Sequence, residues 1–163
     1  MAADQNGHIE CERLLLAAGC DVNQTGDKNC TALLCAAYKG HPEIVRLLLA
    51  SGAQVDHVSD GNVTALLWAA REGRIECVRL LLAAGADANH ANNNGNTALR
   101  LAKRKKHEEI AALLEAHIAE AAEQARLAAL VAQAVASNAA AAAAAAGGQG
   151  QGEDKRSKRK RGQ

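Results

Sequence analysis

The sequence predicts an all-α solenoid of stacked helix–turn–helix–loop units, continued by a long alanine-rich helix. Residues 31–63 and 64–96 are two 33-residue copies of one pattern, and a fixed period of this length is the signature of a repeat architecture. Neither glycine nor proline occurs within residues 107–146, so a helix that begins there can continue. Phe is absent, and Tyr38 and Trp68 are the only aromatic residues, which suits thin layers built from Leu, Ile, Val and Ala.

Residues 64–96 indicate how one unit folds. Thr64 is a favourable N-cap for a short helix that extends to about Arg71. After a tight turn, the apolar residues of a second helix over 75–84 recur along one stripe, and Gly85 ends that helix in a left-handed conformation. A polar, turn-rich loop completes the unit. Because one unit cannot bury its own apolar faces, the units must stack on one another.

The period divides the chain into six segments. They are a partial first repeat (1–24), two full repeats (25–57 and 58–90), a C-terminal repeat (91–118), an alanine-rich helical extension (119–146), and a Gly/Gln linker with a basic disordered tail (147–163). The first segment holds only the second half of a unit, so we expect further repeats upstream of it. A naturally short chain with a frayed first unit is the alternative.

The last helix has no stop signal where the earlier ones end. We expect its first turns, from Glu108, to cap the final repeat. Beyond them the helix either projects or pairs with a partner helix. A coiled coil is the less favoured form of such pairing, because strict heptads are absent.

The repeated motifs resemble those of the ankyrin repeat family. The likeness lies in T-A-L-L-x-A-A, G-H/R-x-E-x-V-R-L-L-L and G-A-x-x-D/N at period 33, and it covers about residues 6–115. The family's usual T-P-L-H is replaced by T-A-L-L at Thr31–Leu34 and Thr64–Leu67 and by T-A-L-R at Thr97–Arg100. The resemblance implies a protein–protein interaction module, a scaffold or adaptor, which binds its partner on a concave surface of loop tips and first-helix ends.

Matching the repeats by register gives the positions on that surface. The candidate partner-binding residues are Asp27, Lys28, Asp60, Asn93 and Asn94 in the loops, and Tyr38, Lys39, Arg71, Glu72, Arg104 and Lys105 at the helix ends. These positions differ between repeats, whereas the Leu and Ala positions recur. Tyr38 and Arg71 are the expected hot spots, since aromatic and Arg side chains dominate interface energetics; the alternative for each is an ordinary exposed residue. Trp68 shares its register with Cys35 and Leu101, so we expect it in the core.

Basic residues cluster near the end of the sequence. Residues 147–163 carry six basic and two acidic side chains, whereas residues 1–146 carry 13 basic and 16 acidic ones. The cations that resemble a nuclear import signal are Lys155, Arg156, Lys158, Arg159, Lys160 and Arg161, and an import receptor would bind them through acidic grooves. A solubilising tail is the alternative. Lys103–Lys106 is either a second import-like patch or a polar end surface.

The tail also suggests an alternative function, that of a nuclear or ribonucleoprotein accessory factor whose basic tail contacts nucleic acid. Against nucleic-acid binding stands the lack of aromatic residues between the basic ones and of any DNA-reading motif. Binding to another protein therefore remains the favoured prediction.

Metal, cofactor and enzyme functions are not predicted. Cys77 shares its register with Ile44 in the second helix, and the cysteines, Cys35 included, are expected to be small core hydrophobes. His57 and His90 recur because the unit recurs. Equivalent positions lie about 10 Å apart, whereas zinc needs its ligands about 2 Å away. No nucleophile motif or phosphate-binding loop is present.

No membrane segment is predicted either. The run 139–146 is too short, and alanine is too weakly apolar, to hold a helix in a bilayer, and the first ten residues lack the apolar run of a signal peptide. We therefore expect a monomer with free thiols in a cytoplasmic or nuclear compartment.

Overall fold

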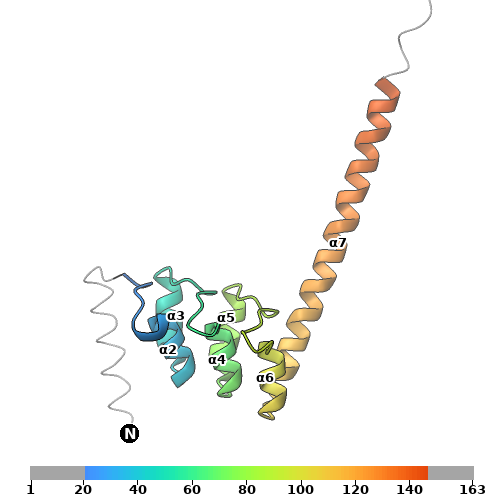
Figure 1. The fold of residues 1–163 in the computed structure, drawn as a ribbon. Coiled ribbons are helices and arrows are strands. Elements are labelled where there is room, and N and C mark those ends of the chain that lie inside the picture. The colour runs from blue at the N-terminus through green and yellow to red at the C-terminus, as the bar shows by residue number, and fades with distance from the viewer. Residues whose placement is uncertain (1–20, 147–163) are drawn as a thin grey trace, which may run out of the picture. The chain divides into compact units, whose positions relative to one another are not determined.

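The computed structural model describes residues 21–146 of the chain. These residues form a short 3-10 helix, η1 (Asp27–Asn29), and six α-helices: α2 (Ala32–Lys39), α3 (Pro42–Ala50), α4 (Ala65–Arg71), α5 (Ile75–Ala83), α6 (Ala98–Arg104) and α7 (Glu108–Ala146). Within that range no strand forms, and the loops contain only two isolated β-bridges. The predicted order of repeats followed by a long helix is confirmed (Figure 1). The basic tail and most of the partial first repeat lie outside the described residues.

Threonine starts each first helix, as the repeated motif predicts. The hydroxyl oxygens of Thr31, Thr64 and Thr97 accept hydrogen bonds from the backbone N–H three residues later, at 3.4, 3.4 and 3.3 Å. Each bond satisfies one of the N–H groups that a helix start leaves without an internal partner. At the other end of α2, Gly40 adopts φ +79°, a conformation that glycine reaches without steric cost.

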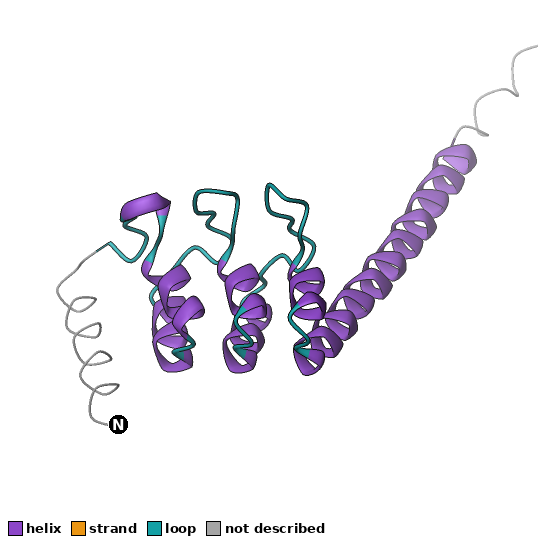
Figure 2. Cartoon of the chain, turned by 60° about the horizontal axis from the view of Figure 1, so that its bottom comes forward, coloured by secondary structure: helices purple, strands orange, loops and turns teal. Residues whose placement is uncertain are grey.

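The repeats form two layers of helices. In the first layer, α2 packs against α4 and α4 against α6, and each of α2 and α4 also packs against its own second helix, α3 or α5. The loops stand together at one end of these helices (Figure 2). The start of α7 supplies the second helix of the last unit, since Ile110, Ala111 and Leu114 are buried in the common core. The expectation that its first turns cap the array is therefore confirmed.

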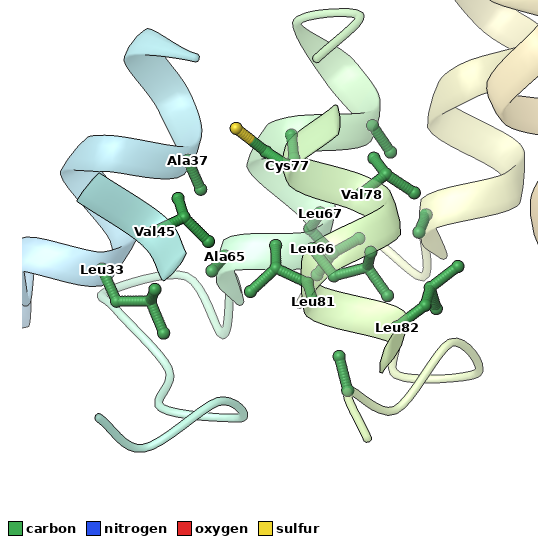
Figure 3. Packing of buried hydrophobic residues seen from close by; sticks show 14 of the residues in the cluster. Leu33, Ala37, Val45, Ala65, Leu66, Leu67, Cys77, Val78, Leu81 and Leu82 are labelled. Carbon is green, nitrogen blue, oxygen red and sulfur yellow. The ribbon is translucent and has the colours of Figure 1, made fainter. Parts of the chain in front are cut away.

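The core consists of leucine, valine and alanine from both layers. Among its members that are essentially inaccessible to solvent are Leu33, Leu34, Ala37, Val45, Leu66, Leu67, Ala69, Ala70, Val78, Leu81, Ala102 and Leu114. These alanines belong to the first helices α2, α4 and α6, and their small side chains suit the close packing of these helices on one another. Figure 3 shows part of this core, with Leu33, Val45 and Leu81 among the labelled residues. Each unit buries its leucines only with the help of its neighbours, so stability depends on the contact between repeats.

The loops are joined by hydrogen bonds that recur at the same period. Asn29 Nδ2 donates to the carbonyl of Val58 at 2.8 Å, and the carbonyl of Asn29 lies 3.0 Å from His57 Nε2. One repeat later, Asn62 Nδ2 donates to Ala91 at 3.0 Å, and the Asn62 carbonyl lies 3.1 Å from His90 Nε2. The recurrence of the two histidines is thus explained by contacts between consecutive loops.

The part of α7 from Ala122 to Ala146 forms a unit separate from the repeats, and every residue in it is exposed. Its largest apolar side chains are Leu127, Leu130, Val131 and Val135. By length and composition alone, α7 is apolar enough to cross a membrane. The expectation that no segment meets this criterion is therefore wrong. The uncharged stretch is longer than the alanine run 139–146, because it begins at Leu127.

Candidate partner-binding surface

Three side chains of the first-helix layer form one cluster across two repeats. Tyr38, at the end of α2, meets Trp68 of α4 edge to face, with ring centroids 5.1 Å apart and ring planes at 80°. The guanidinium carbon of Arg71 lies over the Trp68 ring, 5.0 Å from its centroid, at a distance where a cation is attracted to the ring. Arg71 also pairs with Glu72 at 3.5 Å. We call Tyr38, Trp68 and Arg71 the aromatic cluster.

The expectation that Trp68 lies in the core is wrong. It is only partly buried, and it packs against the core from outside. Register fixes the face of the helix on which a residue lies, but exposure at the edge of that face depends on neighbouring side chains. The equivalent Leu101 is buried whereas the equivalent Cys35 is exposed. Cys35 is therefore not the core residue that register predicts, and Trp68 joins Tyr38 and Arg71 at the surface.

The other helix-end positions are all at the surface. Lys39, Arg104 and Lys105 are exposed, and Glu72 is half-buried beside Arg71. They lie at the C-terminal ends of α2, α4 and α6 or directly after them, at the same end of the repeats (Figure 1). Cations at such positions also interact favourably with the partial negative charge of a helix C-terminus.

The predicted loop positions form a second row. Asp27, Lys28, Asp60, Asn93 and Asn94 are all exposed. Their backbones are joined from one repeat to the next, because Asp60 N donates to Lys28 O at 3.0 Å and Asn93 N donates to Gly61 O at 3.1 Å. The loops are therefore held in line while these side chains remain free to contact a ligand.

The structure separates the two predicted rows. The loop row precedes the first helices and the helix-end row follows them, so the length of a first helix lies between the two. With eight residues in α2, that length is about 12 Å. The sequence predicted these positions as one surface, whereas in the structure each row is a distinct part of it.

The cysteines divide by environment. Cys77 is 1% exposed, as predicted for a core residue, and burial raises the pKa of its thiol to about 11, partly offset by Arg74. Partial burial also raises the pKa of Cys30, with a further contribution from the neighbouring Cys35. The thiolate is the reactive form, so neither site favours nucleophilic chemistry. In residues 21–146 no group of three or more His, Cys, Asp and Glu side chains has the arrangement of a metal site.

Comparison with protein families agrees with the repeat geometry. A family model described as ankyrin repeats (3 copies) matches residues 1–92 and 56–125. Together the two matches span residues 1–125 and so include α2 to α6 and the start of α7. No curated protein matches the chain.

Proposed function

Because the chain belongs to the ankyrin repeat family, whose repeats generally mediate protein–protein interaction, we propose that its first-helix layer and loop tips bind another protein. The family is typically a non-enzymatic interaction module. The proposed surface comprises the aromatic cluster and the two rows of exposed side chains described above.

The aromatic cluster is the observation that carries this proposal. Tyr38 remains 48% exposed, although its ring is already held against Trp68. A rigid aromatic side chain presents a large contact area and loses little conformational entropy when a partner binds. Arg71 is likewise held by Trp68 and Glu72. Aromatic and Arg side chains in such settings are the usual hot spots of interfaces.

The contrast between framework and surface supports the same proposal. Leu33 and Leu66 are equivalent and both buried, whereas Tyr38 and Arg71 are equivalent, exposed and chemically different. Burial restricts the first pair to similar residues. The second pair is free of that restriction, so it can differ according to what the surface binds.

The proposal can be tested by affinity capture from a cell extract. The bait proteins are the full chain, the Tyr38→Ala/Arg71→Ala variant, and a control, Arg46→Ala, at an exposed position of the second-helix layer on α3. Only baits of equal thermal stability are compared. We expect specific protein partners with the full chain and the control, and their loss with the double variant.

The opposite pattern would count against this surface. If all three baits capture the same set and nuclease releases it, the basic tail binds nucleic acid and the repeats only carry the tail. That outcome corresponds to the alternative function, a nuclear or ribonucleoprotein accessory factor.

A further inference from the structure

The helix-end row is strongly basic over all three repeats. The ends of α2, α4 and α6 and the turns that follow them span residues 38–41, 71–74 and 103–107. These segments carry seven Lys and Arg side chains and one carboxylate, that of Glu72. We call these three segments the basic face.

Most of these cations have no carboxylate partner among the described residues. Arg71 pairs with Glu72, and Lys103 pairs with Glu115 of α7. The ion pairs found within residues 21–146 involve none of the other five, which are Lys39, Arg74, Arg104, Lys105 and Lys106. All five are exposed.

Two of the neighbouring acidic residues are engaged in the second-helix layer. Glu76 and Glu109 stand in the first turns of α5 and α7, and both lie within 4 Å of the guanidinium of Arg79, at 3.9 and 3.8 Å. These two carboxylates are thus paired in the second-helix layer, whereas those of Glu43 and Glu108, which also follow the turns, are exposed. The first-helix side retains an excess of positive charge, which favours an anionic ligand.

The turns of the basic face are held in fixed positions relative to one another. The Arg74 side chain packs directly over Gly40 of the preceding turn. Equivalently, the His107 ring lies over Gly73 and its Nε2 is 3.2 Å from the carbonyl of Arg71. Turns that are preorganised in this way lose less entropy on binding than flexible ones.

Packed helices lie about 10 Å apart, so cations at the ends of successive first helices recur at about that distance. An extended peptide in the polyproline II conformation has about three residues per turn and advances about 3.1 Å per residue, so every third side chain lies on the same face, about 9 Å from the one before. Side chains at every third position of such a peptide can therefore reach Lys39, then Arg71 and Arg74, then Arg104 and Lys105.

The aromatic cluster favours a peptide over single-stranded nucleic acid. Base stacking requires an open aromatic face. The ring of Trp68 is instead covered by the Arg71 guanidinium and met by the Tyr38 ring. Tyr38 remains 48% exposed, and this surface suits an apolar side chain next to an acidic one.

We propose that the basic face binds an extended acidic peptide whose carboxylates recur at every third residue. This inference rests on the proposed function, because it names the chemistry of the partner segment that the first-helix layer would receive. Charged motifs are commonly recognised by clusters of basic residues in this manner.

The test uses the full chain and the fluorescence of Trp68, its only tryptophan. Because that residue lies beside the basic face, its signal reports binding there rather than at the basic tail. The probes are three 12-residue peptides: one with Glu at every third position separated by Gly-Ser, one of the same composition with its four Glu residues consecutive, and one with Gln in place of Glu. We expect saturable binding of the first peptide, at least about threefold weaker binding of the second, and none of the third.

Charge-removing variants supply the matched control. Lys39→Gln/Arg104→Gln/Lys105→Gln removes three cations from the basic face. Arg46→Gln/Arg100→Gln/Arg126→Gln removes three exposed cations outside both rows of the proposed surface. We expect the first variant to bind the spaced peptide about tenfold more weakly, since several modest ion pairs are lost together, and the second to change the affinity less than about twofold.

Several results would overturn the inference. One is equal weakening by both variants, which would indicate attraction by net charge alone. Another is equal binding of the spaced and clustered peptides by the unmodified chain, a result independent of whether any variant folds. A third is tighter binding of a 12-nucleotide single-stranded DNA that is lost in the basic-face variant. If the acidic peptide fails while the Tyr38→Ala/Arg71→Ala variant still loses its cellular partner, the proposed function stands and only the acidic-peptide inference falls.

Discussion

Tyr38 and Trp68 belong to successive repeats, and their rings meet edge to face at 5.1 Å. The contact therefore contributes both to the proposed binding surface and to the interface between two repeats. We expect Tyr38→Ala to lower the free energy of unfolding by about 0.5 to 1.5 kcal/mol, the usual range for an aromatic pair. Tyr38→Phe should retain most of the stabilisation, because it keeps the aromatic ring. Urea denaturation followed by Trp68 fluorescence measures both, and equal stability of all three proteins would show that the pair does not couple the repeats.

A substitution at Gly73 or Gly85 can destabilise the fold in two ways, by straining a left-handed backbone and by pushing a neighbouring side chain away. Both have positive φ, +74° and +86°, but a Cβ at Gly73 would lie 2.7 Å from Cε1 of His107, whereas one at Gly85 would meet nothing within 4 Å. Gly85→Ala should cost about 1 kcal/mol for the left-handed backbone. Gly73→Ala should cost about 1 kcal/mol more, because the His107 ring must leave the Arg71 carbonyl. In a His107→Ala background this difference between the two glycines should vanish; its persistence would contradict the account.

Asn62 both donates to the next loop and adopts φ +60°. We expect Asn62→Gly to destabilise the chain by about 1 kcal/mol, because one hydrogen bond to Ala91 is lost while the backbone conformation is retained. Asn62→Ala should destabilise it by about a further 1 kcal/mol, because alanine is disfavoured at positive φ. Chemical denaturation measures the free energy of unfolding of both variants. If Asn62→Ala were the more stable of the two, the left-handed turn would have no role.

Cys77 makes stability depend on alkaline pH. Its pKa is raised in the fold to about 11 from 9.0, so between these values the unfolded chain loses the thiol proton while the folded chain retains it. The unfolded state then binds fewer protons, and stability falls as pH rises.

Cys77→Ala is the matched control for this effect. Under reducing conditions, the stability advantage of the unmodified protein over the variant should be largest below pH 9 and shrink toward pH 11. Measuring unfolding at several pH values across this range provides the comparison. A constant difference would mean that the thiol does not resist ionisation in the fold.

The repeats could be predicted from the sequence because their signals are local and recur. The Thr N-caps, the turn glycines and the apolar stripes specify each helix independently of the rest, and residues such as Thr64 and Gly73 take the positions that the pattern assigns to them. The extent of α7 followed from the lack of any helix-breaking residue.

The surface could be predicted only in part. The exposure of Tyr38 and Arg71 follows from the sequence, but their contact with Trp68 depends on side chains that differ between neighbouring repeats. Register alone placed Trp68 and Cys35 in the core for this reason. A signal was nevertheless present in the sequence, since a large indole stands where the other repeats have the smaller side chains of Cys35 and Leu101.

Site-specific photo-crosslinking tests the central claim most directly. A benzophenone side chain replaces Tyr38 on the first-helix layer or, as the control, Arg46 on the second-helix layer, and both proteins are irradiated with the same captured partner. Our account predicts a crosslink to the partner from position 38 and none from position 46. A crosslink from position 46 alone would place the partner on the opposite layer and contradict the proposed surface.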